Sequence, residues 1–145
     1  MRNINLIILH CSDTEEGRDF TVFDIDRWHK QRGFTCVGYH YVIRIDGTRE
    51  RGRALEAEGA HCLHHNKDSV GICYIGGRSE GRYEDTRTAA QCASMEWLVK
   101  DLLKKFPKAK VCGHRDLNPK KACPCFDARE WARSVGIPKK NILEN

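Results

Sequence analysis

The sequence predicts an α/β domain in which helices flank a central mixed β-sheet. Short apolar runs typical of buried strands alternate along the chain with segments whose apolar residues recur at helical spacing. The 145 residues contain no internal repeat, low-complexity tract or proline- or serine-rich linker, and a chain of this length buries roughly two-thirds of its unfolded surface. We therefore expect a single domain over residues 1–145.

The N-terminal half predicts a strand, a helix and a hairpin, in that order. The first strand is apolar on both faces, as expected inside a covered sheet. Thr21, with Asp24 three residues later, predicts the start of the helix, and Gly33 predicts its end. Asp46-Gly47 is a turn sequence that joins the two strands of the hairpin. The strands span residues 4–9, 37–45 and 48–51, and residues 52–69 lack periodicity and predict a loop.

The C-terminal half predicts two strands and two helices. A strand at residues 70–75 precedes a long irregular stretch that runs to Arg87. Thr88 and Gln91 form a capping box for an amphipathic helix that Pro107 closes. The remaining elements are a short strand at residues 110–113 and a helix that begins at Asp127 and stops at Gly136.

Composition narrows the class of protein. With 40% hydrophobic and 31% charged residues, the chain is typical of globular domains. Its longest apolar run near the start, residues 6–9, is too short for a signal-peptide core or a membrane span. We expect synthesis in the cytoplasm without a signal peptide, and no membrane insertion.

The net charge of +5 indicates a solvated basic helix face or a surface that attracts an anionic polymer. Nucleic acid ranks below cell wall because no nucleic-acid motif is evident.

The eight cysteines favour free thiols over a disulfide framework. No secretory signal is evident, and several cysteines lie inside apolar, strand-like runs, where cysteine is often buried as a small hydrophobic residue. The chain has no C-x-x-C pair, so a zinc ribbon or thioredoxin-type site has little support. We expect one of the thiols to be a metal ligand.

Three residues have the chemistry of a zinc site. His10 directly follows the first predicted strand, where alternation places it on the face opposite Cys11. His114 follows the strand at residues 110–113, and Cys123 comes nine residues later. Strand ends are where α/β proteins open their clefts, and three protein ligands with one open position define a catalytic zinc site. Spacing alone leaves open a buried thiol beside an unrelated histidine.

These residues belong to a longer set of short motifs. In chain order they are Leu9-His10-Cys11-Ser12, Trp28-His29-Lys30 with Gly33, Val37-Gly38-Tyr39-His40-Tyr41, Arg44-Ile45-Asp46-Gly47-Thr48, Gly59-Ala60-His61, Asn66-Lys67-Asp68-Ser69-Val70-Gly71-Ile72, Gly76-Gly77, Thr88-Ala89-Ala90-Gln91, Gly113-His114-Arg115-Asp116 and Ala122-Cys123-Pro124. In these motifs the chain resembles the phage T7-type lysozymes, which are N-acetylmuramoyl-L-alanine amidases, and more distantly the peptidoglycan recognition proteins. The resemblance covers about residues 5–131. It implies a hydrolase of the bond between the muramic acid lactyl group and L-alanine in peptidoglycan.

The resemblance also implies roles for individual residues. His10, His114 and Cys123 would bind one catalytic Zn²⁺, which lowers the pKa of a bound water to about 7. Tyr39 and Lys121 would be the catalytic side chains. The Lys121 ammonium would stabilise the oxyanion of the tetrahedral intermediate, and the Tyr39 hydroxyl would hold the attacking water or donate to the oxyanion.

Two departures from the phage pattern leave alternatives open. The stretch between His114 and Cys123 is one residue longer than in the closest phage enzymes, so Lys120 is an alternative to Lys121. Cys125 stands where the phage pattern has serine, which puts a rival thiolate two residues from the expected ligand.

Other positions carry weaker predictions. The resemblance places His61 beside the substrate cleft, where it would contact the substrate or shape the site. Asp116 would either orient an imidazole or form a salt bridge with an arginine. We expect His29 on the polar side of the first helix, and strand alternation puts Tyr39 on the same face as Tyr41. No H-E-x-x-H motif supplies a carboxylate base, so the proton acceptor is not assigned.

The resemblance makes peptidoglycan the expected partner of a monomer that reaches the cell wall after its release from the cytoplasm, as a phage or prophage lysis enzyme does. An enzyme that recycles wall fragments in the cytoplasm would have a similar sequence. Two other classes remain: a module that binds muropeptide without cutting it, and a regulator that binds a phage RNA polymerase. No carboxylate pair supports a glycosidase.

Overall fold

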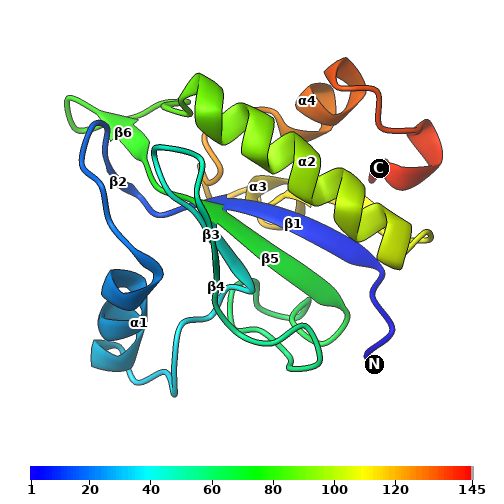
Figure 1. Ribbon diagram of the computed structural model, residues 1–145, viewed down its shortest axis with the longest axis horizontal. Coiled ribbons are helices and arrows are strands. Elements are labelled where there is room, and N and C mark those ends of the chain that lie inside the picture. The colour runs from blue at the N-terminus through cyan, green and yellow to red at the C-terminus, as the bar shows by residue number, and fades with distance from the viewer. Residues whose placement is uncertain (145) are drawn as a thin grey trace.

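The computed structural model describes residues 1–144, and its main sheet has five strands in the order β4-β3-β5-β1-β8 (Figure 1). The bounds are Leu6–Cys11 for β1, Tyr41–Ile43 for β3, Arg49–Arg51 for β4, Ser69–Tyr74 for β5 and Lys110–Gly113 for β8. The pairs β3–β5, β5–β1 and β1–β8 are parallel, and only β4 runs antiparallel to its neighbour. The sheet is therefore mixed, as predicted. The predicted domain ends at residue 145, which lies outside the described residues.

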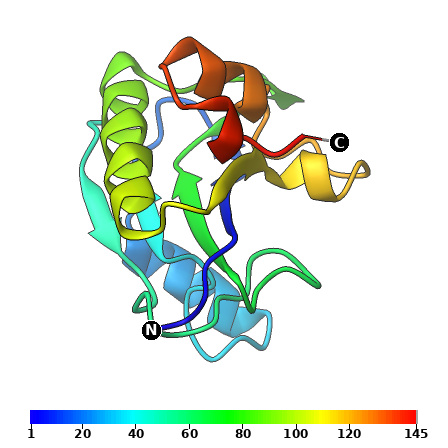
Figure 2. The same ribbon diagram turned by 90° about the vertical axis from the view of Figure 1, so that its right-hand side faces the viewer.

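One face of the sheet is covered by α2 (Ala89–Lys105) and α4 (Ala128–Ser134), which Figure 2 shows beside the sheet. The Thr88–Gln91 capping box is present as predicted. The amide of Gln91, fully buried, also donates to the carbonyl oxygens of Ile43 and Ile75. The residue that caps the helix therefore also joins the helix start to the sheet.

The opposite face is covered only in part. The helix α1 (Val22–Gln31), capped by Thr21 and Asp24 as predicted, packs over β3 and β5. A second group on this face lies at β1 and β8 and includes Ile8 and Cys112. The two groups leave the carboxyl ends of the central strands accessible from this side, and the candidate site lies there.

Several short elements were not predicted. The stretch expected to be irregular up to Arg87 contains two strands of a second, three-stranded sheet with order β2-β6-β7. These strands are β2 (Thr14–Glu15), β6 (Gly77–Ser79) and β7 (Arg82–Tyr83), and the short helices α3 (His114–Leu117) and η1 (Lys139–Asn141) follow later in the chain. Segments of two to four residues are too short to show a period. Among residues 1–144, no helix has both the length and the apolar composition that crossing a bilayer requires.

The second predicted strand was too long, and the predicted side of the sheet for Tyr39 was therefore wrong. Only Tyr41–Ile43 is strand, because the carbonyl oxygens of residues 38–40 accept hydrogen bonds from the loop at residues 52–60. Alternation consequently fails before Tyr41. Tyr39 packs with the cluster beneath α1, whereas Tyr41 and Ile43 pack with the cluster beneath α2.

Candidate active site

The parallel register of β1 and β8 brings two histidines together. Leu9 pairs with Gly113, so the next residues, His10 and His114, emerge side by side. Their ring centroids are 4.7 Å apart. The first strand has the predicted length but begins and ends two residues later than predicted, because His10 and Cys11 continue the pairing with β5. His10 is therefore 1% exposed inside the strand rather than in a loop after it.

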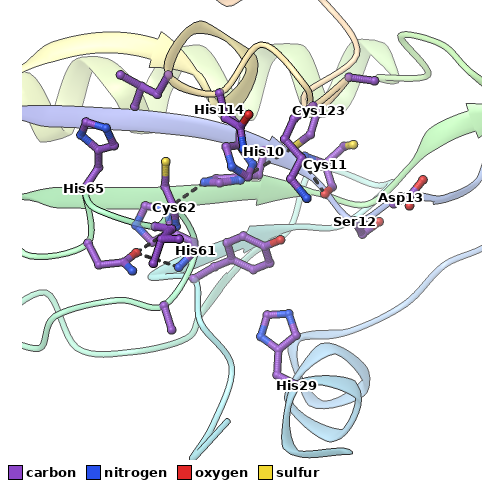
Figure 3. A pocket seen from close by; sticks show the side chains of 18 of the residues that line it. His10, Cys11, Ser12, Asp13, His29, His61, Cys62, His65, His114 and Cys123 are labelled. Atoms are coloured by element: carbon purple, nitrogen blue, oxygen red, sulfur yellow. Dashed lines mark hydrogen bonds between the residues drawn. The ribbon is translucent and has the colours of Figure 1, made fainter. Parts of the chain in front are cut away.

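Cys123 reaches this histidine pair from the loop after α3. The Cys11 N–H donates to Cys123 Sγ at 3.2 Å, and the Arg115 N–H donates to the Cys123 carbonyl oxygen at 2.9 Å. Cys123 Sγ lies 3.7 Å from His10 Nδ1. These contacts hold the thiol against the end of β1, facing the histidines (Figure 3).

The three side chains fit a zinc ion. The potential ligand atoms of His10, His114 and Cys123 all lie within 4.8 Å of one another. Tetrahedral zinc with ordinary Zn–N and Zn–S bonds separates a nitrogen from a sulfur ligand by about 3.6 Å, close to the 3.7 Å between His10 Nδ1 and Cys123 Sγ. Two imidazoles and one thiolate are a suitable donor set for zinc and leave one coordination position for solvent.

His61 and Ser69 continue the site behind His10. His10 Nε2 lies 2.8 Å from His61 Nδ1 (Figure 3). His61 Nε2 in turn lies 3.1 Å from Ser69 Oγ. If His10 Nδ1 keeps its lone pair for a metal, its Nε2–H donates to His61 Nδ1. His61 then carries its own proton on Nε2 and donates to Ser69. Burial lowers the pKa of His10 and lowers that of His61 to about 3, so both rings are neutral near pH 7.

The surrounding chain fixes the position of the His61 ring. The Asn66 side-chain oxygen accepts the backbone N–H groups of His61 and Cys62 and so holds the turn at residues 61–66. A Cβ atom at Gly71 would lie 2.6 Å from the His61 ring, so glycine is needed there for close approach. Since both ring nitrogens of His61 already have partners, the geometry favours a shaping role over direct contact with substrate.

Tyr39 also packs beside His10, with ring centroids 5.1 Å apart. Burial raises the pKa of its phenol, so the hydroxyl remains protonated and able to donate near neutral pH. The prediction that His29 is on the polar side of α1 was wrong. His29 is buried, and its Nδ1 accepts the Gly38 N–H at 2.9 Å, which holds the turn before Tyr39. Its position four residues after buried Ile25 is the spacing that could have revealed this.

Both lysine alternatives lie at the site. Lys120 and Lys121 are both exposed and both line the pocket at the ligand cluster. Burial lowers the pKa of His114, and the nearby Lys121 ammonium lowers it further. This electrostatic contact favours Lys121 as the residue that faces the site.

The rival thiol and the nearby aspartate also have definite positions. Cys125 Sγ lies 3.7 Å from Cys11 Sγ, and Cys125 is not among the three residues of the ligand cluster. Asp116 accepts the Gly113 N–H at 2.7 Å and lies 3.4 Å from the Arg129 guanidinium. Of the two roles predicted for Asp116, these contacts support the salt bridge with an arginine.

The ligand cluster opens into a cleft of about 980 Å³. Its rim carries the cationic side chains of Arg32, Lys120 and Lys121. Exposed Leu63 and Tyr83 add apolar surface along the same cleft. A cleft with these walls suits a substrate that carries both carboxylates and apolar groups.

Comparison with known proteins identifies relatives over most of the chain. The family model described as N-acetylmuramoyl-L-alanine amidase matches residues 1–126. The endolysin of Escherichia phage T7 is 40% identical over 126 residues, covering 86% of this chain and 83% of that protein. The N-acetylmuramoyl-L-alanine amidase LysC from Clostridium intestinale has a TM-score of 0.80 at 30% identity, covering 94% of this chain and 88% of that one. Drosophila PGRP-LB shares the fold, with a TM-score of 0.79 at 23% identity over 100% of this chain and 88% of that one. The predicted fold class is thus confirmed.

Proposed function

Since the chain belongs to the N-acetylmuramoyl-L-alanine amidase family, we propose that it is a zinc-dependent enzyme that hydrolyses the amide bond between the muramic acid lactyl group and L-alanine in peptidoglycan. The observation that carries the zinc dependence is the convergence of His10, His114 and Cys123 within 4.8 Å at the base of an open cleft. His10 lies in β1, His114 directly follows the neighbouring strand β8, and Cys123 comes from a separate loop.

The three ligands would hold one zinc ion. A bound zinc would lower the pKa of a coordinated water to about 7 and polarise the scissile carbonyl group. The chain's own contribution is the donor set and its orientation: His10 is held by His61, and Cys123 is held by the Cys11 N–H. Ligands held in this way need little rearrangement when the substrate arrives.

Two side chains would act directly on the substrate. The Lys121 ammonium stands at the cleft beside His114, where it would stabilise negative charge on the carbonyl oxygen of the scissile amide. The protonated hydroxyl of Tyr39 would donate a hydrogen bond to the same oxygen or orient the attacking water. Arg32, at the rim, would attract the carboxylates of the peptide stem.

The relatives support a role in lysis. The phage T7 relative is an endolysin, and we propose that this chain likewise acts on the cell wall as a phage-type or prophage-type lysis enzyme. The net charge of +5 would favour the anionic wall polymer. A role in recycling wall fragments predicts a preference for small soluble muropeptides over intact sacculi, so comparing the two substrates separates the roles.

The deciding experiment is digestion of purified peptidoglycan by the zinc-loaded protein, followed by mass spectrometry of the products. The proposal predicts free peptides that begin with L-alanine, together with uncut glycan strands. Cys123→Ser should lose both zinc and turnover, and Cys92→Ser, on α2, is the matched control. Chelator should abolish turnover and added zinc should restore it. Cut glycan strands, or muropeptide binding without any cleavage by the zinc-loaded wild type, would overturn the proposal.

A further inference from the structure

Two thiols meet directly behind the Cys123 ligand. Cys11 Sγ and Cys125 Sγ are 3.7 Å apart, although 114 residues separate them in the chain. Strand alternation turns Cys11 away from His10, and Cys125 adopts a φ of 69°, in the left-handed region, two residues after Cys123. The thiol pair therefore lies next to the ligand Cys123, whose side chain also interacts with the Cys11 thiol.

The neighbouring backbone leaves room for this pair. A Cβ atom on Gly77 would lie 2.6 Å from Cys11 Sγ and 3.6 Å from Cys125 Sγ, so the missing side chain provides the space that the sulfurs occupy. Cys11 is 4% exposed, whereas Cys125 is partly exposed. The pair thus has one buried and one partly exposed residue.

We propose that Cys11 and Cys125 are a disulfide-forming site that fastens the ligand loop to β1 once the protein meets an oxidising small-molecule disulfide. Closing the bond requires the sulfurs to approach from 3.7 Å to about 2.05 Å. Cys123 stays outside the bond and remains available as a ligand.

The reaction balances with oxidised glutathione as the oxidant. The Cys125 thiolate attacks one glutathione sulfur, which forms a mixed disulfide and releases one glutathione thiol. Cys11 then attacks the Cys125 sulfur of that mixed disulfide and displaces the second glutathione. Two protein thiols lose two electrons and two protons, and one glutathione disulfide becomes two glutathione thiols.

Two consequences follow for the site. The disulfide would tie the loop that carries Cys123 to the strand that carries His10, and it would remove Cys125 as a competing thiol. The second consequence rests on the proposed zinc function, whereas formation of the bond does not. Disulfide mapping and zinc retention therefore test the two ideas separately.

The test uses the full, zinc-loaded chain, incubated overnight at pH 8.5 with oxidised glutathione, then denatured, alkylated and digested with trypsin without reduction. Trypsin leaves Cys11 on the peptide 3–18, but it leaves Cys123 and Cys125 together on the peptide 122–129. Fragmentation of the linked peptides must therefore locate the bond. We expect a Cys11–Cys125 link, alkylated Cys123, and one zinc retained per chain.

Two variants complete the design. Cys125→Ser should abolish the link and keep zinc, and Cys92→Ser, which removes a partly exposed thiol on α2, should form the link as the wild type does. Oxidation should slow zinc release to a chelator several-fold in the wild type and leave Cys125→Ser unchanged. The proposal is overturned if Cys123 takes part in the bond, or if Cys11 and Cys125 remain unlinked under these conditions.

Discussion

The His10–His61 contact gives a prediction that can be worked through in magnitude. His61→Ala removes the acceptor 2.8 Å from His10 Nε2. His10 is 1% exposed, so its Nε2–H would be left buried without that partner. An unsatisfied buried donor costs about 1–3 kcal/mol. The cost applies to the form of His10 that binds zinc, with its proton on Nε2 and its Nδ1 free. Zinc affinity should therefore fall roughly 10- to 100-fold, the usual range when a residue that hydrogen-bonds to a metal ligand is removed.

The assay is zinc binding by the metal-free protein in competition with a chromophoric chelator at constant pH, with circular dichroism to check folding. His61→Asn should recover most of the affinity, because its side-chain oxygen can accept from His10 where His61 Nδ1 does. Leu63→Ala is the control, since Leu63 is an exposed residue that lines the same cleft. If folded His61→Ala bound zinc as tightly as the wild type, His61 would not support zinc binding by His10.

Three further variants test other parts of the site. Lys121→Ala should lower kcat for peptidoglycan turnover by about 100- to 1,000-fold, the usual loss for one oxyanion donor. Lys120→Ala should change kcat less than about tenfold. Equal losses in the two variants would contradict the assignment of Lys121. Tyr39→Phe should keep full zinc content by metal analysis while kcat falls, and loss of zinc would instead mean that the hydroxyl supports the metal site. Gly71→Ala should destabilise the fold by about 1–3 kcal/mol in thermal or urea denaturation, because the added methyl group collides with the His61 ring. Unchanged stability would show that the ring moves aside freely.

The local features of this fold were predictable because their causes lie within a few residues. The capping boxes of Thr21 with Asp24 and of Thr88 with Gln91 are each contained in four residues, and both occur in the structure. The turn at Asp46-Gly47 was predictable for the same reason. Among the site residues, His10, His114 and Cys123 were identified by residue type and by motifs that recur in a family, not by any contact visible in the sequence.

The orientation of Tyr39 could not be predicted from local sequence. Alternation holds only where a strand continues, and hydrogen bonds from the loop at residues 52–60 end the strand before Tyr41. His29 was misplaced for a related reason. Its spacing from Ile25 is consistent with burial, but the partner of its buried ring, the Gly38 N–H, comes from a turn nine residues later.

By itself, the sequence determined which residue types were present for the chemistry and where the helices begin, because capping and turn formation are local. Tertiary structure alone decided how the ligands meet. The pairing of Leu9 with Gly113 places His10 beside His114, and a shift of one residue would turn one of them to the other face of the sheet. The partners that complete the site, His61 behind His10 and Cys125 beside Cys11, are 51 and 114 residues distant in the chain. Strand pairing and packing set such separations, and no local pattern encodes them.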